Sequence, residues 1–198
     1  MELREVMQKR KSIRQYLTTP VEEEKVKAMI EAAILAPTWK NAQEIRYYVA
    51  VSEEKRQAVL DALAEGNRKK TQNAPVFLIS AVILNRAGFQ KDGTADNELG
   101  NGWGYYDCGL HDMNLLLEAA NQGLSTLVMG LRDADKLREA FDIPKEESIV
   151  SVISVGYSDV DPDRPTRKSV EEIASTSYRT RVIVKEHTEK QADFAGTY

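Results

Sequence analysis

The sequence has little cysteine and histidine, and it has no long apolar run. Of its 198 residues only one is a cysteine and two are histidines, so an internal disulfide is excluded and a structural zinc site is not expected. No apolar run approaches the ~20 residues that span a bilayer. Glu2, Arg4 and Glu5 stand where a signal peptide has its apolar core. We therefore expect a cytoplasmic protein without a membrane partner.

An excess of positive charge is also missing, as are several nucleotide and nucleophile motifs. The net charge is −4, whereas a nucleic-acid surface needs surplus Lys and Arg. No GxxxxGK[ST] motif occurs, and Gly100, Gly102 and Gly104 lack the position and spacing of a dinucleotide fingerprint. No nucleophile elbow is present, and Cys108 falls inside a predicted helix. No residue is therefore predicted to act as a catalytic nucleophile, acid or base.

What is present is an alternation of helical and extended hydrophobic patterns. The predicted helices cover residues 2–10, 20–35, 52–66, 106–122 and 133–143. The predicted strands cover residues 45–51, 75–84, 124–129 and 148–157. The run 75–84 is almost entirely apolar, which predicts a central strand covered on both faces. Strands that alternate with helices predict an α/β or an α+β sheet with helices on its faces.

Local signals predict where these helices begin, end and face the core. Thr19 followed by Pro20 fits a cap and a first helical position, so a helix is predicted to begin at Pro20. Gly66 is expected to end the helix that starts after Ser52. The segment 85–104, rich in glycine, is expected to be a functional or mobile loop. On the helix 106–122 the buried face is predicted to contain Leu110, Met113, Leu117 and Ala120, and Leu115 and Leu116 are predicted to widen it.

Three short basic clusters stand out in an otherwise acidic chain. They cover residues 10–14, 67–70 and 164–168. In the first, three cations and the Ser12 hydroxyl lie within five residues, a set of donors that suits an anion. Taken alone, the first cluster fits a solvated basic helix end better than a binding site. A phosphate site follows only if the fold brings the clusters together.

Four segments, taken in order, resemble motifs of the FMN-dependent nitroreductase family. Residues 10–16, RKSIRQY, resemble its opening R-x-S-x-R-x-F/Y signature, and residues 36–43, APTWKNAQ, resemble its A-P-S-x-x-N-x-Q loop. Residues 123–130 resemble the G-L-x-x-x-x-x-G strand, and residues 167–173 are similar to R-K-P-L-E-E-V. The resemblance implies an α+β fold with a central mixed, mainly antiparallel sheet flanked by helices. It further implies an intertwined homodimer that holds FMN at its interface.

The resemblance also implies which residues bind the cofactor. Arg10, Ser12 and Arg167 would contact the FMN phosphate, Arg14 would face N1 and the C2 carbonyl, and Lys69 would reach the pyrimidine edge. A fixed cation beside N1 stabilises reduced flavin, and arginine keeps its charge near neutral pH. The full implied set is Arg10, Lys11, Ser12, Arg14, Pro37, Thr38, Asn41, Asn67, Lys69, Met129, Gly130, Arg164, Arg167 and Lys168. Of these, Pro37, Thr38 and Asn41 would come from the partner chain, and Met129 and Gly130 would offer backbone N–H groups.

The activity implied is hydride transfer from NAD(P)H through flavin N5 to a nitroaromatic, a quinone or a similar acceptor. A non-catalytic flavin- or anion-binding homodimer and a reductive dehalogenase of the same fold are the alternatives.

Trp39 and Glu44 depart from the family loop, where a serine and a proline are usual. Trp39 either stacks near the flavin or packs in a core or interface. Residues 1–175 are expected to form one FMN-binding domain, and residues 176–198 an arm that either reaches across the dimer or is loose.

Overall fold

A computed structural model describes residues 2–175, and it divides the chain into one compact unit of residues 1–163 and a second unit that begins at Arg164. The predicted arm 176–198 lies outside the described residues. The helices are α1 Leu3–Lys9, α2 Glu23–Ala33, the short 3-10 helix η1 Trp39–Asn41, α3 Glu53–Ala62, α4 Glu65–Thr71, α5 Gly102–Asn121, α6 Ala134–Phe141 and α7 Val170–Ile173. The strands are β1 Ile45–Ala50, β2 Val76–Ile83, β3 Ser125–Met129 and β4 Glu147–Gly156. Within the described part of the chain, no helix is long and apolar enough to cross a membrane.

The four strands form one sheet in the order β1-β2-β4-β3. All three pairs of neighbouring strands are antiparallel, and a single parallel bridge joins Ser12 to Thr126. The chain therefore has an α+β architecture. The apolar run 75–84 forms β2, an internal strand, as its composition predicts. The strand predicted at 124–129 forms β3 at the sheet edge, where Val128 is exposed.

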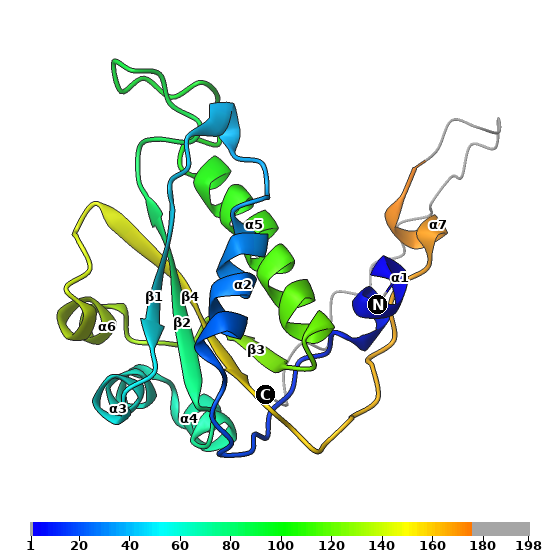
Figure 1. Ribbon diagram of the computed structural model, residues 1–198. Coiled ribbons are helices and arrows are strands. Elements are labelled where there is room, and N and C mark those ends of the chain that lie inside the picture. Colours follow the sequence, from blue (N-terminus) through cyan, green and yellow to red (C-terminus); the bar gives the residue numbers. More distant parts are fainter. Residues whose placement is uncertain (1, 176–198) are drawn as a thin grey trace, which may run out of the picture. The chain divides into compact units, whose positions relative to one another are not determined.

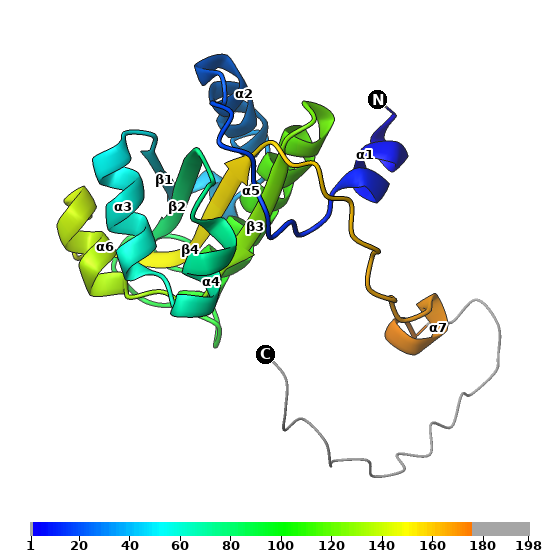
Figure 2. The ribbon, with the colours of Figure 1, turned by 90° about the horizontal axis from the view of Figure 1, so that it is seen from below.

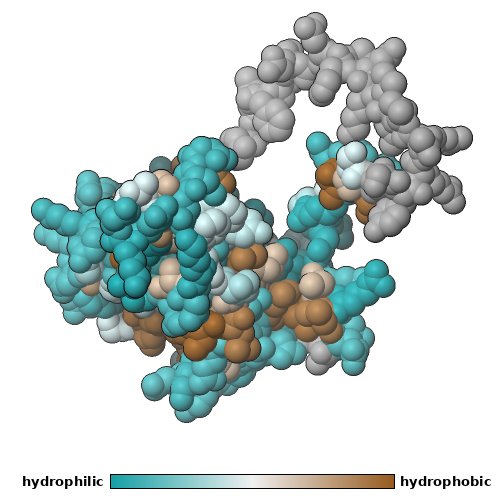
Figure 3. Space-filling model, turned by 90° about the horizontal axis from the view of Figure 1, so that it is seen from above, coloured by the Kyte–Doolittle hydropathy of each residue, from teal (hydrophilic) through white to brown (hydrophobic). Residues whose placement is uncertain are grey.

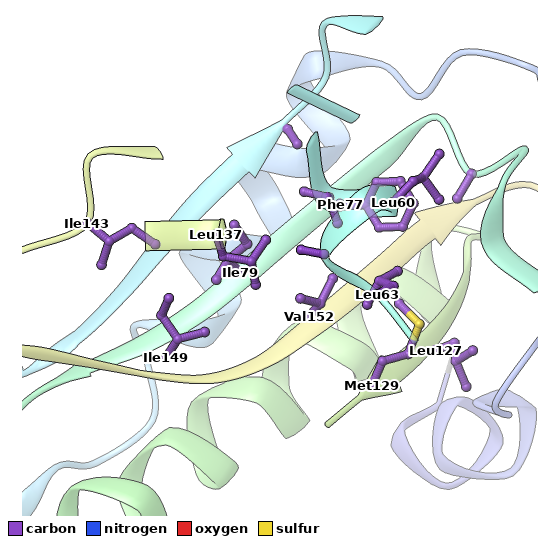
Figure 4. Packing of buried hydrophobic residues seen from close by; sticks show 14 of the residues in the cluster. Leu60, Leu63, Phe77, Ile79, Leu127, Met129, Leu137, Ile143, Ile149 and Val152 are labelled. Carbon is purple, nitrogen blue, oxygen red and sulfur yellow. The ribbon is translucent and has the colours of Figure 1, made fainter. Parts of the chain in front are cut away.

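Helices cover both faces of the sheet, with α2 and α5 on one face and α3 and α6 on the other (Figures 1 and 2). Alternate residues of β2 point to opposite faces, as a strand requires. Phe77 and Ile79 belong to the core cluster with residues of α3 and α6, which Figure 4 shows in close-up. Val76 and Leu78 belong to the cluster with α2 and α5. Because both faces are buried, the register of this strand is strongly specified.

Three predicted helix boundaries are wrong, two of them for a tertiary reason. Helix α2 begins at Glu23 rather than Pro20, because the preceding segment is bonded to the end of β4, where Leu17 donates to the Tyr157 carbonyl. Helix α3 ends at Ala62, since Leu63 is extended and pairs with Arg132. Gly66 consequently lies inside α4 instead of ending α3. Helix α5 begins at Gly102, four residues before its predicted start.

The buried face of α5 also differs from the prediction. Met113 is 47% exposed, and Leu110 and Leu117 are only partly buried. Ala120, Leu115 and Leu116 are buried as predicted, and the buried face also carries Asp107, Cys108, His111, Asp112 and Ala119. Hydrophobicity alone missed part of this face because several buried positions are polar and some of them are bonded across to the sheet. Tyr47 and Ser80, for example, both donate to the Asp112 carboxylate, at 2.9 and 3.2 Å.

Candidate functional site

The basic segment 10–14 lies along the exposed edge of β3. The Ile13 amide donates to the Thr126 carbonyl at 2.9 Å, next to the bridge between Ser12 and Thr126. The Ile13 and Tyr16 side chains are buried, and the Tyr16 hydroxyl bonds to the Ile13 carbonyl and the Ser154 hydroxyl, at 2.9 Å each. Ser12 and Arg14, on either side of Ile13 in the sequence, are exposed. The apolar residues thus fix the segment while its polar side chains face outward.

A cavity of about 300 Å³ opens beside this segment. Lys9, Arg10 and Lys11 line it together with hydroxyl-bearing residues of β3 and of the chain after β4, among them Ser125 and Ser158. The Lys11 ammonium forms an ion pair with Asp161 at 2.6 Å, so the acidic residue in the cavity is already paired. Cations and hydroxyl donors around one small cavity are the donor set that a phosphate group requires. Arg10 and Lys11, both predicted cofactor residues, therefore share one cavity.

The far end of β3 is open at its backbone. Gly130 follows β3 directly and lines a second cavity, of about 570 Å³, with Leu63, Ala64 and Leu131. A Cβ built on Gly130 meets no other atom within 4 Å, so the space in front of its backbone is free. The Met129 side chain is buried in the core, and Met129 is paired with Val152 of β4.

The second basic cluster lies on α4, next to this open backbone. The Ala64 amide, at the start of α4, donates to the Leu131 carbonyl at 3.2 Å. Lys69 is exposed and is paired with Glu65, one helical turn before it. Surface pairs of this kind contribute at most about 1 kcal/mol. The Lys69 ammonium is therefore available to exchange its partner for a ligand, and Asn67 precedes it by two residues on the same helix.

The loop from Pro37 to Gln43 has an unusual backbone. Lys40, Asn41 and Gln43 have φ of 48, 57 and 50°, in the left-handed region that residues other than glycine rarely adopt. The Thr38 hydroxyl accepts from the Gln43 amide at 3.1 Å and closes the loop on itself. Such backbone conformations persist only where surrounding contacts hold them, and they gather at functional sites.

Contacts with the segment 85–101 and with α5 hold this loop. The Trp39 indole donates to the Asp96 carboxylate at 3.1 Å, and the Lys40 ammonium donates to the same carboxylate at 2.8 Å. The Trp39 and Trp103 rings lie 4.4 Å apart between centroids. The backbone amide of Trp39 donates to Oδ2 of Asp107 at 2.6 Å. Of the two predicted roles of Trp39, these contacts support packing against its own chain.

Sequence reasoning missed the buried acids behind this loop. Glu44 and Asp107 are 0% and 4% exposed, and His111 is 5% exposed. Burial lowers the pKa of His111 below its ordinary value. Burial, and then the neighbouring Asp107 carboxylate, raise the pKa of Glu44 to about 7. The sequence contained a signal for the buried polar positions of α5, because Asp107, His111 and Asp112 recur at helical spacing within an otherwise apolar helix.

The third basic cluster lies in the second unit, which is described by itself. The exposed Arg167 guanidinium donates to the Pro165 carbonyl at 3.0 Å. Ser169 and Glu172 form a capping box at the start of α7. The predicted meeting of Arg164, Arg167 and Lys168 with the residues 10–14 stays a prediction.

Comparison with known proteins identifies the class to which this fold and site belong. The model of the nitroreductase family matches residues 7–157. That match spans most of the chain, and it includes three of the four segments that resemble family motifs. The chain belongs to the nitroreductase family.

Individual relatives agree with this assignment. The FMN reductase [NAD(P)H] of Bacillus subtilis is 29% identical over 167 residues, which cover 80% of this chain and 65% of that protein. The NADPH-flavin oxidoreductase of Vibrio harveyi is 26% identical over 156 residues, covering 77% of this chain and 64% of that protein. Among solved structures, an FMN complex from Exiguobacterium sibiricum superposes with a TM-score of 0.77 at 22% identity, covering 89% of this chain and 97% of the other.

Proposed function

We propose that this chain is an FMN-dependent oxidoreductase that passes a hydride from NAD(P)H to a nitroaromatic, a quinone or a similar small acceptor. One observation carries the proposal. The basic segment 10–14 is bridged to β3 at Thr126, and the open backbone of Gly130 directly follows the end of the same strand. A ligand with a phosphate at one end and a flat ring at the other matches that arrangement. Membership of the nitroreductase family supports the same reading.

The residues of the chain fit FMN at both ends of β3. Arg10 and Lys11 would bind the phosphate within their cavity, with hydroxyl donors from β3 and from the chain after β4 beside them. Gly130 leaves its backbone open to a flat ring, since a Cβ there would meet nothing. Arg14 is exposed, and it would supply a permanent positive charge to the bound flavin. Bound FMN would supply the hydride-accepting chemistry, while these residues bind and orient it.

We further propose a homodimer in which each site uses both chains. The loop with Pro37, Thr38 and Asn41 lies at the N-terminal half of α5, whereas β3 begins four residues after this helix ends (Figure 1). A helix of this length extends about 30 Å. A loop and a strand that lie toward opposite ends of such a helix do not easily reach the same small ligand. They reach it more readily when a second chain contributes the loop.

The absorption spectrum of the purified protein tests the cofactor. We expect a flavin spectrum, or its appearance on titration with FMN, and bleaching on addition of NADH or NADPH. A protein that binds no FMN contradicts the proposal. Multiple turnovers with a nitroaromatic or a quinone distinguish the reductase from a flavin-binding dimer without activity.

A further inference from the structure

Asp107 makes the main polar contact between α5 and the backbone of the loop 37–43. Its side chain is 4% exposed, and its Oδ2 accepts from the Trp39 amide at 2.6 Å. The next residues, Lys40 and Asn41, have positive φ, a backbone that costs of order 1 kcal/mol or more at each such residue and needs external support. A short hydrogen bond from the loop to a carboxylate is the strongest single support of this type.

A second buried acid follows the same loop. The Glu44 side chain is fully buried, and no N–H or O–H group of residues 2–175 donates to either of its carboxylate oxygens. It lies against the first turn of α5, because a Cβ built on Gly104 would be 3.9 Å from Glu44 Cγ. Asp107 is one turn further along that helix and faces Glu44. Two buried carboxyl groups that face each other are most stable when they share one proton.

Few other charged groups act on this pair. Arg86, after β2, exerts a weaker attraction on Glu44, and Cys108 on α5 is close enough to feel the Glu44 charge. Burial raises the pKa of the Cys108 thiol, so this thiol stays neutral near pH 7. His111 lies near Asp107, and burial lowers its pKa. Of these groups, Glu44 is therefore the one that changes charge near neutral pH.

We propose that Asp107 is a positioning residue for the loop that contacts the flavin, and that the proton carried by the neighbouring Glu44 controls how firmly the loop is held. The inference rests on the proposed function, because the loop matters only if it contributes Pro37, Thr38 and Asn41 to an FMN site. With the proton present, Glu44 is neutral and Asp107 keeps its bond to Trp39. Without it, a negative charge without a hydrogen-bond donor among residues 2–175 is buried beside Asp107, and the loop loosens.

The direction of the pH effect follows from the raised pKa of Glu44, about 7. Below pH 7 the pair holds its proton and the loop is ordered. Above pH 7 the proton is lost, so the loop should open more often and FMN should bind more weakly. Glu44→Gln removes the titrating group and keeps the shape of the side chain, so it should abolish this dependence.

Amide hydrogen exchange at residue 39, measured on the full-length protein with and without added FMN, tests the proposal directly. For the wild type we expect exchange, corrected for its intrinsic rate, to be about tenfold faster at pH 8 than at pH 6. Glu44→Gln should show equal corrected rates. Asp107→Ala should exchange at least about tenfold faster at both pH values, and Asp107→Asn, which still offers an acceptor oxygen, should restore most of the protection.

Asp112→Asn is the matched control, since it alters a buried carboxyl group of the same helix face that bonds to the sheet and not to the loop. It should keep the wild-type pH response. A wild type without pH response, or a Glu44→Gln variant that keeps it, overturns the role of the Glu44 proton. Wild-type protection in Asp107→Ala overturns the positioning role.

Fluorescence titration with FMN separates this inference from the proposed function. We expect wild-type affinity to fall about tenfold between pH 6 and pH 8, and affinity of Glu44→Gln to stay constant. Absence of FMN binding in every variant contradicts the proposed function, whereas the exchange rates still report on the acid pair. If the exchange rate of the loop changes with pH but the affinity for FMN does not, the link between loop and flavin is overturned.

Discussion

At the scale of single residues, Glu44 stands where the family loop usually has proline, and it is completely buried. Its pKa rises from 4.5 to about 7, because burial disfavours its charged form and Asp107 repels it. The folded protein thus binds this proton more tightly than the unfolded chain does. The corresponding stability is fully present below pH 4.5 and is lost as the pH rises toward 7.

We expect Glu44→Gln to be more stable than the wild type at pH 8, by up to about 3 kcal/mol, and to differ little at pH 5. Urea unfolding at both pH values measures this difference. His111 titrates in both proteins, so subtracting the two curves isolates the contribution of Glu44. The exposed Glu98 provides the control, since Glu98→Gln should leave the pH profile unchanged. Equal pH profiles for Glu44→Gln and the wild type would contradict the assigned pKa.

At the scale of elements, the start of α5 packs against β2 without space for a side chain. A Cβ on Gly104 would lie 2.6 Å from Val82 Cγ1, closer than carbon atoms approach in folded proteins. Gly109, on the same helix, is exposed, and a Cβ there would meet nothing within 4 Å. The two glycines therefore form a matched pair.

Gly104→Ala should lower the free energy of unfolding by about 1–3 kcal/mol, because the helix must shift away from the sheet. Gly109→Ala should raise it by up to about 1 kcal/mol, because alanine favours the helix over glycine. Thermal and urea unfolding measure both changes. A neutral Gly104→Ala would show that α5 is packed more loosely on β2 than described.

At the scale of the whole molecule, apolar side chains on the surface are consistent with association. Tyr105, Tyr106 and Met113 of α5 are 43, 61 and 47% exposed. Viewed from above, apolar patches interrupt an otherwise hydrophilic surface (Figure 3). Exposed apolar patches commonly mark protein interfaces. Sedimentation over a range of concentrations should show twice the chain mass of 22.3 kDa.

Mixing two inactive variants tests whether each site uses both chains. Arg14→Ala and Asn41→Ala should each bind FMN weakly as pure proteins. Mixed dimers, formed by co-expression, contain one intact site, in which Arg14 comes from one chain and Asn41 from the other. We expect FMN binding at about half of the sites of mixed dimers. No recovery contradicts the shared site.

Much of the fold was predictable because it depends on local periodicity. The apolar run 75–84 could only be a covered strand, and the alternation of helical and extended hydrophobic patterns predicted the four strands of the sheet. Helix ends were less predictable, because contacts distant in sequence decide them. Leu63, for example, leaves the helix to pair with Arg132.

The sequence by itself determined the class of the protein and the residues suited to an anion, because residue type and spacing define both. Only the tertiary structure decided which groups are neighbours. It placed the segment 10–14 on the edge of β3 and buried Glu44 beside Asp107 behind the loop. The physical reason is that burial and charge coupling depend on distances through space, which chain spacing does not encode.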